Sequence, residues 1–380
     1  MKIAFVYDAL YPYSIGGGEK RYWEIASRLS AHHEVHMISW KYWDGAADLE
    51  RDGIFYHGVG RPPSLYTEDG KRSIREAVEF GLRSARVATL GKFDVLEVCA
   101  FPYFHALPLW LISRVRREPV VMTWHEYWGD YWTQYLGRGA QAAQAVERVA
   151  LPLADWRVAV SALTARRLRA GGRGGAQISV IPNGIDFDAL SSVPRRAPEF
   201  DVTYVGRLIE HKRVDLLLQA LRLLRQCLPD IRCQIVGTGP DHDRLERLAA
   251  DLELGSSVRF RGHVDEKTVY NVIAGSKVLV MPSEREGFGM TVLEAAACGV
   301  PSIVVRGHYS AADEIVEDGV SGLVVDPDPR CLADAAESVI RSPDAGRRMG
   351  DAAQALASRY DWTKIADESL AIYERVRMAH

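Results

Sequence analysis

The chain has 380 residues, of which 47% are hydrophobic and 26% are charged, and its formal net charge is −3. This composition is typical of a folded globular protein of about two domains and excludes a disordered chain. The five cysteines are scattered, so they match neither a disulfide framework nor a zinc site, and they favour a reducing cytoplasm.

Charge is distributed unevenly along the chain. Residues 1–180 carry 23 Lys and Arg against 19 Asp and Glu, whereas residues 181–380 carry 24 against 31. A basic excess of this kind is ordinarily interpreted as a solvated helix face. Its functional interpretation is a surface that attracts an anionic acceptor or a lipid bilayer. The basic excess of the first half gathers at Arg114, Arg116 and Arg117, and then at Arg166, Arg167, Arg169 and Arg173.

The first half of the chain alternates between strand-like and helix-like segments. Residues 2–9 predict a strand, residues 19–32 an amphipathic helix, and residues 34–40 a second strand. Apolar runs at 93–100, 119–125 and 156–162 continue the series, which predicts a parallel sheet covered by helices on both faces. Residues 95–115 are apolar but contain Glu97 and His105, so they predict a buried strand and a helix rather than a membrane span.

The alternation restarts after a run rich in Gly, Pro and Ser at 171–198, which is the best candidate for a domain boundary. Residues 214–228 predict an amphipathic helix, and the end of the chain is also helical in its periodicity. Two such α/β halves predict two Rossmann-like domains that face each other across a cleft. Further strands are expected at 201–208, 232–239, 258–264, 277–283, 301–305 and 322–327.

Glycine turns follow two of the expected strands. Gly16 and Gly17 allow a ligand to approach the backbone, and amides at the start of the next helix can face an anion. A tight turn explains these glycines equally well, because their spacing matches neither the P-loop nor the dinucleotide fingerprint. Gly237 lies in a similar turn, where it allows the chain to bend sharply beside the expected cleft.

Two cations lie close to the end of the first strand of the second half. Arg207 follows that strand, and Lys212 comes five residues later. A planar guanidinium and a compact ammonium together suit a diphosphate, although two surface cations are the alternative. Two Asp-x-Asp pairs, at 186–188 and 326–328, are interpreted as turn residues rather than as metal ligands.

His125 directly follows the strand at 119–124, so it is expected to project into the cleft. A structural histidine with Glu126 as its partner is the alternative interpretation. The segment around it is rich in aromatic residues, which suit sugars or lipid headgroups but also suit a packed loop. The acceptor-binding candidates are Trp124, Tyr127, Trp128 and Tyr131.

The segment EREGFGMTVLE, residues 284–294, joins an expected strand to an expected helix. Glu286 falls on the loop, and Glu294 falls about one turn into the helix. Amides at the helix start favour a phosphate. The two glutamates therefore predict two groups that bind hydroxyls on either side of a phosphate site, rather than an acid/base couple or a metal site.

In these motifs the chain resembles the family-four retaining glycosyltransferases, which have the GT-B fold. The resemblance rests on the E-x7-E motif Glu286–Glu294 together with VGRLIEHK, VIPNGID, IVGTGP, VRFRGHV and the opening GGGE. It covers nearly the whole chain. It implies an N-terminal acceptor domain, 1–178, onto which a final helix, 363–380, packs back, and a C-terminal donor domain, 179–362.

The resemblance implies a role for each matching residue. Glu286, His125, Arg207 and Lys212 are implied in catalysis, with Arg207 and Lys212 holding the donor diphosphate. Glu286 is implied to bind the donor sugar, and Glu294 the ribose. The remaining donor-binding candidates are Gly16, Gly17, Gly206, Gly237, His263, Val264, Gly287, Phe288, Gly289, Met290, Thr291 and Val292.

The implied reaction moves a hexose from a UDP- or GDP-sugar to a glycan, lipid-linked or small-molecule acceptor. It proceeds by a front-face mechanism and needs no metal and no cofactor beyond the sugar nucleotide. Nucleic acid is not an expected partner. The expected location is cytoplasmic, with peripheral contact at the inner membrane face through the basic N-terminal domain. An epimerase or phosphorylase of the same fold, or a non-catalytic sugar-nucleotide-binding protein, remains an alternative.

Overall fold

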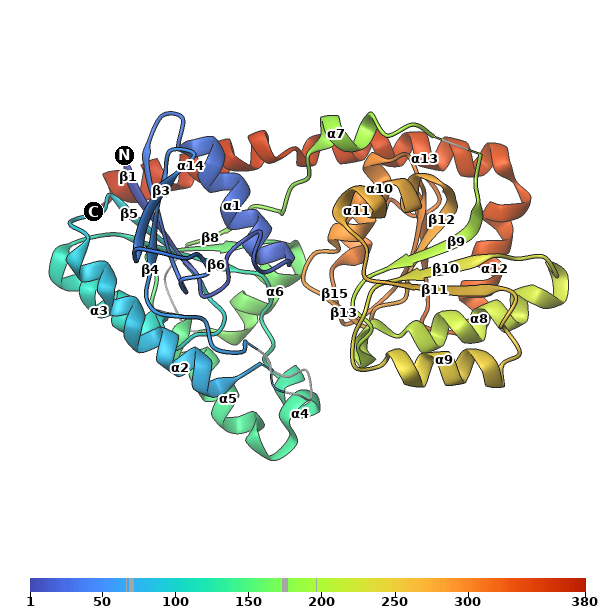
Figure 1. Ribbon diagram of the computed structural model, residues 1–380, viewed down its shortest axis with the longest axis horizontal. Coiled ribbons are helices and arrows are strands. Elements are labelled where there is room, and N and C mark those ends of the chain that lie inside the picture. The colour runs from blue at the N-terminus through green and yellow to red at the C-terminus, as the bar shows by residue number, and fades with distance from the viewer. Residues whose placement is uncertain (66, 68–71, 173–176, 196) are drawn as a thin grey trace. The chain divides into compact units, whose positions relative to one another are not determined.

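The computed structural model describes residues 1–380 except 66, 68–71, 173–176 and 196 (Figure 1). The chain forms two compact units. Unit 1 comprises Met1–Asn183 together with Trp362–His380, and unit 2 comprises Gly184–Asp361. Each unit is built on a largely parallel sheet with helices on both faces, so the predicted α/β fold is confirmed. The cleft expected between the units stays a prediction.

Unit 1 contains an eight-stranded sheet with the strand order β3-β4-β2-β1-β5-β6-β7-β8. All neighbouring strands are parallel except β3 and β4, which form an antiparallel pair at the edge. Both faces of β5 and β6 are buried, as expected for strands covered by helices on both sides. The strands are β1 (Lys2–Val6), β2 (Glu34–Ser39), β3 (Asp48–Arg51), β4 (Ile54–Gly58), β5 (Val95–Cys99), β6 (Val120–Trp124), β7 (Trp156–Ala159) and β8 (Gln177–Val180).

Helices cover this sheet on two sides. On one side α1 packs against the C-terminal helix α14, which returns to unit 1 from the far end of the sequence (Figure 1). On the other side lies the main hydrophobic core, which includes Phe80, Leu109 and Trp132. The helices are α1 (Gly17–Leu29), α2 (Ile74–Arg83), η1 (Ser84–Thr89), α3 (Ala106–Arg116), α4 (Tyr131–Leu136), η2 (Gly137–Gly139), α5 (Ala140–Ala150), α6 (Ala162–Gly171) and α14 (Trp362–Met378).

A buried carboxyl group, that of Glu97 on β5, links several of these elements. It accepts hydrogen bonds from the Tyr22 hydroxyl of α1 at 3.0 Å and from the Thr123 hydroxyl of β6 at 2.6 Å. Burial raises the pKa of Glu97 to about 7, although hydrogen bonds from Thr123, Tyr22 and Tyr373 and the charge of Arg21 act in the opposite direction. Because Tyr373 belongs to α14, this carboxyl group also ties the returning helix to the sheet.

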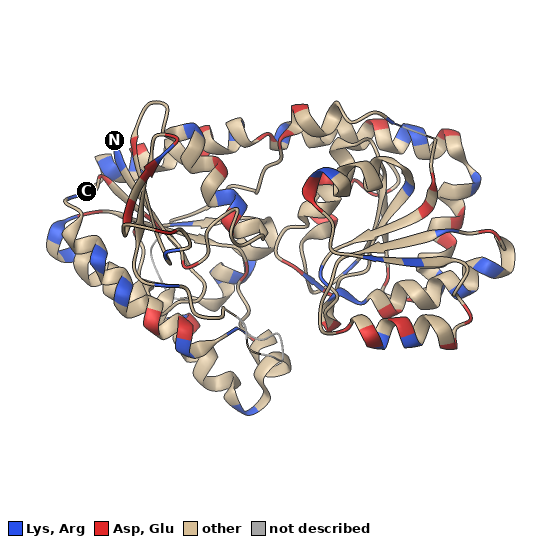
Figure 2. Ribbon diagram, viewed as in Figure 1, with Lys and Arg blue, Asp and Glu red and all other residues tan. Residues whose placement is uncertain are grey.

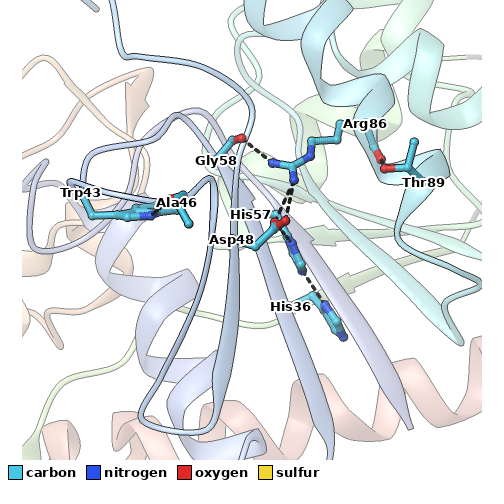
Figure 3. A network of polar contacts seen from close by, with 8 residues as sticks. All are labelled: His36, Trp43, Ala46, Asp48, His57, Gly58, Arg86 and Thr89. Carbon is cyan, nitrogen blue, oxygen red and sulfur yellow. Dashed lines mark hydrogen bonds and ion pairs between the residues drawn. The ribbon is translucent and has the colours of Figure 1, made fainter.

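A second polar network holds the antiparallel edge of the same sheet (Figure 3). The imidazoles of His36 on β2 and His57 on β4 are joined at 2.8 Å, and His57 Nδ1 lies 2.6 Å from Asp48 on β3. Arg86 of η1 donates to both oxygens of Asp48 and to the carbonyl of Gly58. The network therefore fastens η1, the connection between α2 and β5, to the sheet edge.

Unit 2 contains a six-stranded parallel sheet with the order β11-β10-β9-β12-β14-β16 and a separate pair, β13 and β15. Helices α8 and α9 lie on one face, and α10 and α11 lie on the other (Figure 1). The strands are β9 (Phe200–Val205), β10 (Cys233–Val236), β11 (Val258–Gly262), β12 (Ser276–Met281), β13 (Arg285–Glu286), β14 (Ser302–Val305), β15 (Tyr309–Ser310) and β16 (Gly322–Val325).

The amphipathic helix predicted at 214–228 is observed as α8, whose Leu216, Leu217 and Leu221 are buried. Asp328, from one of the two Asp-x-Asp pairs, caps α12 by accepting from two backbone amides, which agrees with its interpretation as a turn residue. The helices of unit 2 are α7 (Phe187–Ser191), η3 (Glu210–Lys212), α8 (Val214–Cys227), α9 (His242–Asp251), α10 (Glu266–Ala274), α11 (Met290–Ala297), η4 (Ala312–Glu314), α12 (Pro329–Arg341), α13 (Pro343–Ala357) and η5 (Ser358–Tyr360).

Within the described ranges, no helix combines the length and the apolar character that crossing a bilayer requires. The apolar stretch 95–115 forms β5 and α3, as predicted.

The buried carboxyl group of Glu97 predicts a pH-dependent stability. Its folded pKa of about 7 exceeds its ordinary value of 4.5, so between these values the folded state keeps a proton that the unfolded state releases. Stability therefore falls as pH rises through this window, by up to about 3 kcal/mol. Glu97→Gln should remove this part of the pH dependence, so the difference in unfolding free energy between pH 4.5 and pH 8, measured in urea, should become smaller.

The control for this experiment is Glu79→Gln, which changes a carboxyl group on the outer side of α2. It should leave the difference in unfolding free energy between pH 4.5 and pH 8 as in the unchanged protein. An undiminished pH dependence in Glu97→Gln would contradict the role given to the buried carboxyl group.

Candidate functional site

The sheet order of unit 2 brings the predicted donor-binding residues to one edge. Strands β11, β10, β9 and β12 are consecutive neighbours and run parallel, so their carboxyl ends lie side by side. His263 and Val264 follow β11, Gly237 follows β10, Gly206, Arg207 and Lys212 follow β9, and residues 286–294 follow β12. This edge is where ligands bind in open α/β sheets.

One of the glycines at this edge, Gly237, is required by backbone packing. Gly206 N donates to Val236 O at 3.0 Å, and Gly237 N donates to Gly262 O at 2.8 Å. Gly237 has φ of +135°, and a Cβ there would collide with the carbonyl oxygen of Gly206. The turns after β9 and β10 can therefore lie against each other only because this position has no side chain. A contact of Gly237 with the donor stays a prediction.

Lys212 and Glu286 are joined by an ion pair within unit 2. Lys212 comes from the turn η3 after β9, and Glu286 comes from β13, which follows β12. The position of Glu286 is fixed further by pairing of β13 with β15 and by a 2.8 Å hydrogen bond from Ala311 N to its carbonyl oxygen. The pair therefore links the turns at the ends of two adjacent strands, and both side chains are largely buried.

His211, which was not singled out from the sequence, lies beside this ion pair. Burial lowers its pKa to about 2, and the nearby charges of Arg285, Lys212 and Arg207 act in the same direction. Its backbone oxygen accepts from Glu284 N at 2.9 Å. The imidazole is consequently neutral at physiological pH, and the local positive charge belongs to the arginines and the lysine. The sequence signal was its position between the two predicted cations.

The glycine-containing loop and the start of α11 form the other part of the site. Gly289, with φ of +105°, precedes the helix, and its carbonyl oxygen accepts from the amides of Val292 and Leu293. The amides of Met290 and Thr291 lie in the first turn, where a helix carries partial positive charge. Glu294 lies one turn further along the helix and is half-buried. The helix start predicted after Gly289 is thus confirmed.

The other predicted donor-binding residues of unit 2 lie in different environments. The ring of Phe288 is buried and lies 6.0 Å from that of Tyr360, so its side chain contributes to packing. Gly287 precedes it in the loop. His263 is exposed, and Arg207 is exposed at the end of β9, where its carbonyl oxygen accepts from the Tyr204 hydroxyl at 3.0 Å. Donor contacts of these residues stay predictions.

In unit 1 the glycine turn begins α1. Gly16 is its N-cap, and Gly17 is its first residue. The carboxylate of Glu19 lies over this turn, because a Cβ on Gly16 would collide with it, and it accepts from the Ser14 hydroxyl at 2.9 Å. The helix start therefore already has an acidic side chain beside it. The motif GGGE was the only signal for Glu19 at the level of sequence.

His125 directly follows β6, as predicted, and its ring lies close to the start of α1. A Cβ on Gly18 would lie 3.3 Å from His125 Nε2. Burial lowers the pKa of His125 to about 3, and the charge of Arg21 acts in the same direction. Nε2 is buried and has no hydrogen-bond partner among the described residues. A neutral imidazole with an unused nitrogen can bind a hydroxyl, but it cannot supply a proton as an acid.

The aromatic segment after β6 is mostly a packed cluster, which corrects one prediction. Trp124 is completely buried in the core of unit 1, so its ring does not line a surface that an acceptor could reach. Tyr127 and Tyr131 are also buried, and Trp128 is half-buried, with its ring 4.4 Å from that of Trp132. The physical reason is Glu147.

The Glu147 carboxylate accepts hydrogen bonds from the backbone of this segment. It accepts from the amides of Trp128 and Gly129 at 2.8 and 2.7 Å and from the Tyr103 hydroxyl at 2.8 Å. Buried polar groups need such partners, and the loop therefore folds inward around this one. Acceptor contacts of Tyr127, Trp128 and Tyr131 stay predictions, with Trp128 the most accessible of the three.

A pocket that the sequence did not predict opens elsewhere in unit 1, with a volume of about 270 Å³. Aromatic rings form much of its wall, and Arg51 and Asp52 lie at the turn between β3 and β4. Aromatic rings combined with a few polar groups suit a sugar ring. It is lined by Leu10, Tyr11, Pro12, Tyr13, Trp23, Trp43, Leu49, Arg51, Asp52 and Tyr56.

The arginine runs of the first half are partly neutralised within the protein. Arg114 pairs with Asp155, Arg116 with Glu118, and Arg167 with Asp130. Arg167 also donates to the carbonyl groups of Tyr127 and Trp128. Basic and acidic residues occur together on many elements of both units (Figure 2). In the described ranges, no three His, Cys, Asp or Glu residues are grouped as a metal site would require.

Comparison with known proteins gives matches over both units. Residues 15–189 match the model of the family described as Glycosyltransferase Family 4, and residues 189–356 match that described as Glycosyl transferases group 1. The phosphatidyl-myo-inositol mannosyltransferase of Mycobacterium leprae is 32% identical over 293 residues, which are 75% of this chain and 74% of that relative.

Solved structures are similar over the full chain. Sucrose-phosphate synthase from Thermosynechococcus elongatus matches with a TM-score of 0.83 at 21% identity and covers 100% of both chains. HepE from Anabaena, solved with UDP-glucose, matches with a TM-score of 0.74 at 22% identity and covers 98% of this chain and 99% of that one. These likenesses confirm the predicted GT-B fold.

Backbone packing at Gly237 predicts a cost for any side chain there. Gly237→Ala should destabilise unit 2 by about 1–3 kcal/mol, because the Cβ meets the Gly206 carbonyl and φ is positive. Urea unfolding measures this change. The control is Gly255→Ala, since a Cβ at Gly255 meets nothing within 4 Å. Equal stability of the two variants would contradict the packing argument.

Proposed function

Because the chain belongs to glycosyltransferase family 4, we propose that it moves a hexose from a UDP- or GDP-sugar to a hydroxyl group with retention of anomeric configuration. The acceptor is proposed to be a glycan, a lipid-linked molecule or a small molecule. Transferase activity itself follows from the family; the donor, the acceptor and the stereochemistry are the proposal.

One observation carries the proposal, namely the Lys212–Glu286 ion pair at the edge where β9 and β12 end. The ion pair holds Lys212 at Glu286, four residues before α11 begins, so positive charge and the helix-start amides belong to the same sheet edge. Such a combination suits the diphosphate of a sugar nucleotide. The carboxylate of Glu286 can accept hydrogen bonds from sugar hydroxyls, and Glu294, on the same helix as those amides, can accept them from the ribose.

The proposed reaction proceeds on one face of the donor sugar. The bond between the anomeric carbon and the phosphate oxygen breaks, and the acceptor oxygen forms a bond to the same carbon from the same side. The acceptor proton passes to the leaving phosphate oxygen. Arg207, Lys212 and the amides of Met290 and Thr291 stabilise the charge that develops on the diphosphate, and a fixed positive field costs no reorganisation at that moment.

Metal independence is part of the proposal. Two cationic side chains and helix-start amides at the same sheet edge supply the electrostatic role that a divalent ion fills in other transferases. Neutral His211 keeps the charge of this group on Lys212, Arg207 and Arg285.

His125, Gly16 and Gly17 are proposed to contact substrate from unit 1. The low pKa of His125 makes its role a hydrogen bond to a sugar hydroxyl rather than general acid catalysis. For the acceptor, the 270 Å³ pocket is a better candidate than Trp124, because Tyr13 in its wall is exposed whereas Trp124 is completely buried.

The relatives support the chemistry at a coarser level. The Mycobacterium leprae protein is a mannosyltransferase by name, and the Anabaena structure holds UDP-glucose. Both sugars are hexoses, and this agreement supports a hexose donor for this chain.

The ion pair predicts a large and non-additive effect on turnover. Lys212→Ala and Glu286→Ala should each lower kcat/KM by about 100-fold or more, since each removes a group proposed to act on the donor. The double variant should lose much less than the product of the two, because the residues act as a pair. Steady-state transfer with UDP- and GDP-hexoses measures this, once a donor has been found by thermal shift.

Lys267→Ala is the matched control, because Lys267 is an exposed lysine on α10 of the same unit. Its kcat/KM should equal that of the unchanged protein. Full activity of Lys212→Ala and Glu286→Ala would rule out the proposed site, and free sugar as the main product would favour another reaction.

Stereochemistry and metal dependence give a separate test. The product should have the same anomeric configuration as the donor, which NMR coupling constants of the new linkage report. Activity should persist within a factor of about two in excess EDTA, because the charge on the leaving diphosphate is balanced by protein groups. An inverted product, or loss of activity that Mg²⁺ or Mn²⁺ restores, would contradict the mechanism.

A further inference from the structure

Two helices of unit 1 expose rows of aliphatic side chains. Twelve large hydrophobic residues are exposed in the described part of the chain, and half of them lie on α2 and α3. Within each helix the three residues are four positions apart, so they form one row along the helix. These rows, the aliphatic stripes, consist of Ile74, Val78 and Leu82 on α2 and Leu107, Leu111 and Val115 on α3.

The stripes are not part of the core that the two helices cover. Helix α2 buries Ala77 and Phe80 toward the core, and α3 buries Ala106 and Leu109. The stripes are highly exposed by comparison, with Leu82 at 72% and Val115 at 86%. Single exposed apolar residues are ordinary on proteins, but ordered rows on neighbouring helices indicate an interaction surface.

The helices that carry the stripes are neighbours and are firmly held. A Cβ on Gly81 would lie 2.9 Å from the backbone of Phe104, and the rings of Phe80 and His105 are 5.5 Å apart. Figure 1 shows α2 and α3 along the same flank of unit 1. Because Arg86 fastens η1 to the sheet edge (Figure 3), the end of α2 is fixed as well.

The start of α2 is anchored by a buried carboxylate. Glu76 accepts from the Trp40 indole at 2.6 Å and pairs with Arg72 at 2.9 Å. This anchor fixes the rotation of the helix about its axis, with Glu76 inward and the stripe outward. The exposed row is therefore a permanent feature of the folded unit.

Arginines border the stripes. Arg75 and Arg117 are exposed beside Ile74 and Val115. Arg83, Arg114 and Arg116 also lie next to the stripes, where each is paired with a carboxylate, that of Glu79, Asp155 or Glu118. The basic residues of α3 itself, Arg114 and Arg116, lie in its last turn. The two helices contain only two acidic residues, Glu76 and Glu79, of which Glu76 is buried and Glu79 pairs with Arg83. Trp110 of α3 lies beneath the Arg114 guanidinium, with 5.8 Å between that group and the ring centroid.

We propose that the outer faces of α2 and α3 bind the surface of a bilayer that contains anionic lipids. The aliphatic stripes enter the boundary between headgroups and acyl chains, and the arginines contact lipid phosphates. Tryptophan and arginine beside an apolar row are typical of helices that lie in this boundary. Binding to a bilayer surface explains why α2 and α3 expose aliphatic side chains, although neither helix is long and apolar enough to cross a bilayer.

The same features argue against a second copy of the chain as the partner. A symmetric contact through these faces would place the arginines of one copy against those of the other. The centres of protein interfaces are depleted of charge, whereas a lipid headgroup layer supplies a phosphate for every arginine. Charge complementarity therefore favours the bilayer.

This membrane contact differs from the one expected at the Arg166–Arg169 run, because α6, which carries that run, has no residue among the exposed large hydrophobics in the described part. Helices α2 and α3 combine both the apolar and the basic component.

Vesicle flotation tests the proposal without any sugar donor, so its outcome is independent of the proposed transfer reaction. The unchanged protein should float with vesicles of phosphatidylglycerol and phosphatidylcholine, more weakly with phosphatidylcholine alone, and less as salt is raised. Leu82→Ser/Leu111→Ser should weaken partitioning by about tenfold or more. Arg75→Glu/Arg117→Glu should abolish the preference for anionic vesicles.

Matched controls lie in unit 2. Val320→Ser replaces an exposed aliphatic residue, and Arg222→Glu reverses an exposed arginine on α8, and neither should change flotation. All substituted side chains are exposed, so circular dichroism and unfolding curves should match those of the unchanged protein. Absence of flotation by the unchanged protein, or equal flotation of the stripe variant, would overturn the proposal. A dimer that dissociates in Leu82→Ser/Leu111→Ser would overturn it too and would assign the face to a second copy.

Discussion

Parallel pairing of β11, β10, β9 and β12 is the constraint on which the candidate site depends. Parallel strands place their carboxyl ends at one edge, and each strand in this series ends in a segment with charged residues or glycine. Residues as distant in the sequence as Lys212 and Glu286 become an ion pair for that reason. If β12 paired elsewhere, Lys212 would not meet Glu286, and the start of α11 would not lie at the same sheet edge as Lys212.

Close packing and electrostatics act together at this edge. Gly237 lets two strand-end turns touch, which sets the path of the chain toward Arg207 and Lys212. His211, in the turn after β9, is buried close to Arg285, Lys212 and Arg207. It stays neutral because burial and these positive charges both disfavour a further positive charge there. The result is a fixed group of positive charges with one carboxylate, an arrangement that suits a diphosphate and a sugar.

Unit 1 uses buried polar groups for a different purpose, which is to fix elements relative to its sheet. Glu97 joins α1, β6 and α14 from the middle of the sheet. The network of His36, His57, Asp48 and Arg86 secures the sheet edge and η1. Glu76 holds α2 from the inside in the same way, and its outer face remains available for an external partner. A chain held on a bilayer surface in this way would suit a lipid-linked acceptor.

The periodicity of the sequence determined the α/β class, the order of most elements and the positions of the motifs at strand ends, because these depend on local patterns. It also placed His125 after a strand and Gly289 before a helix, as observed. Patterns of this kind report which face of an element is apolar. They do not report what covers that face.

Tertiary structure decided the rest. The same aromatic pattern permitted either a sugar-binding wall or a packed loop, and Glu147, nineteen residues after Trp128, selected the packed loop. The tertiary structure also revealed the pocket between α1 and the β3–β4 turn and the outward stripes of α2 and α3. These features depend on which residues meet across the sheet, and contacts between distant residues leave no periodic signal in a single sequence.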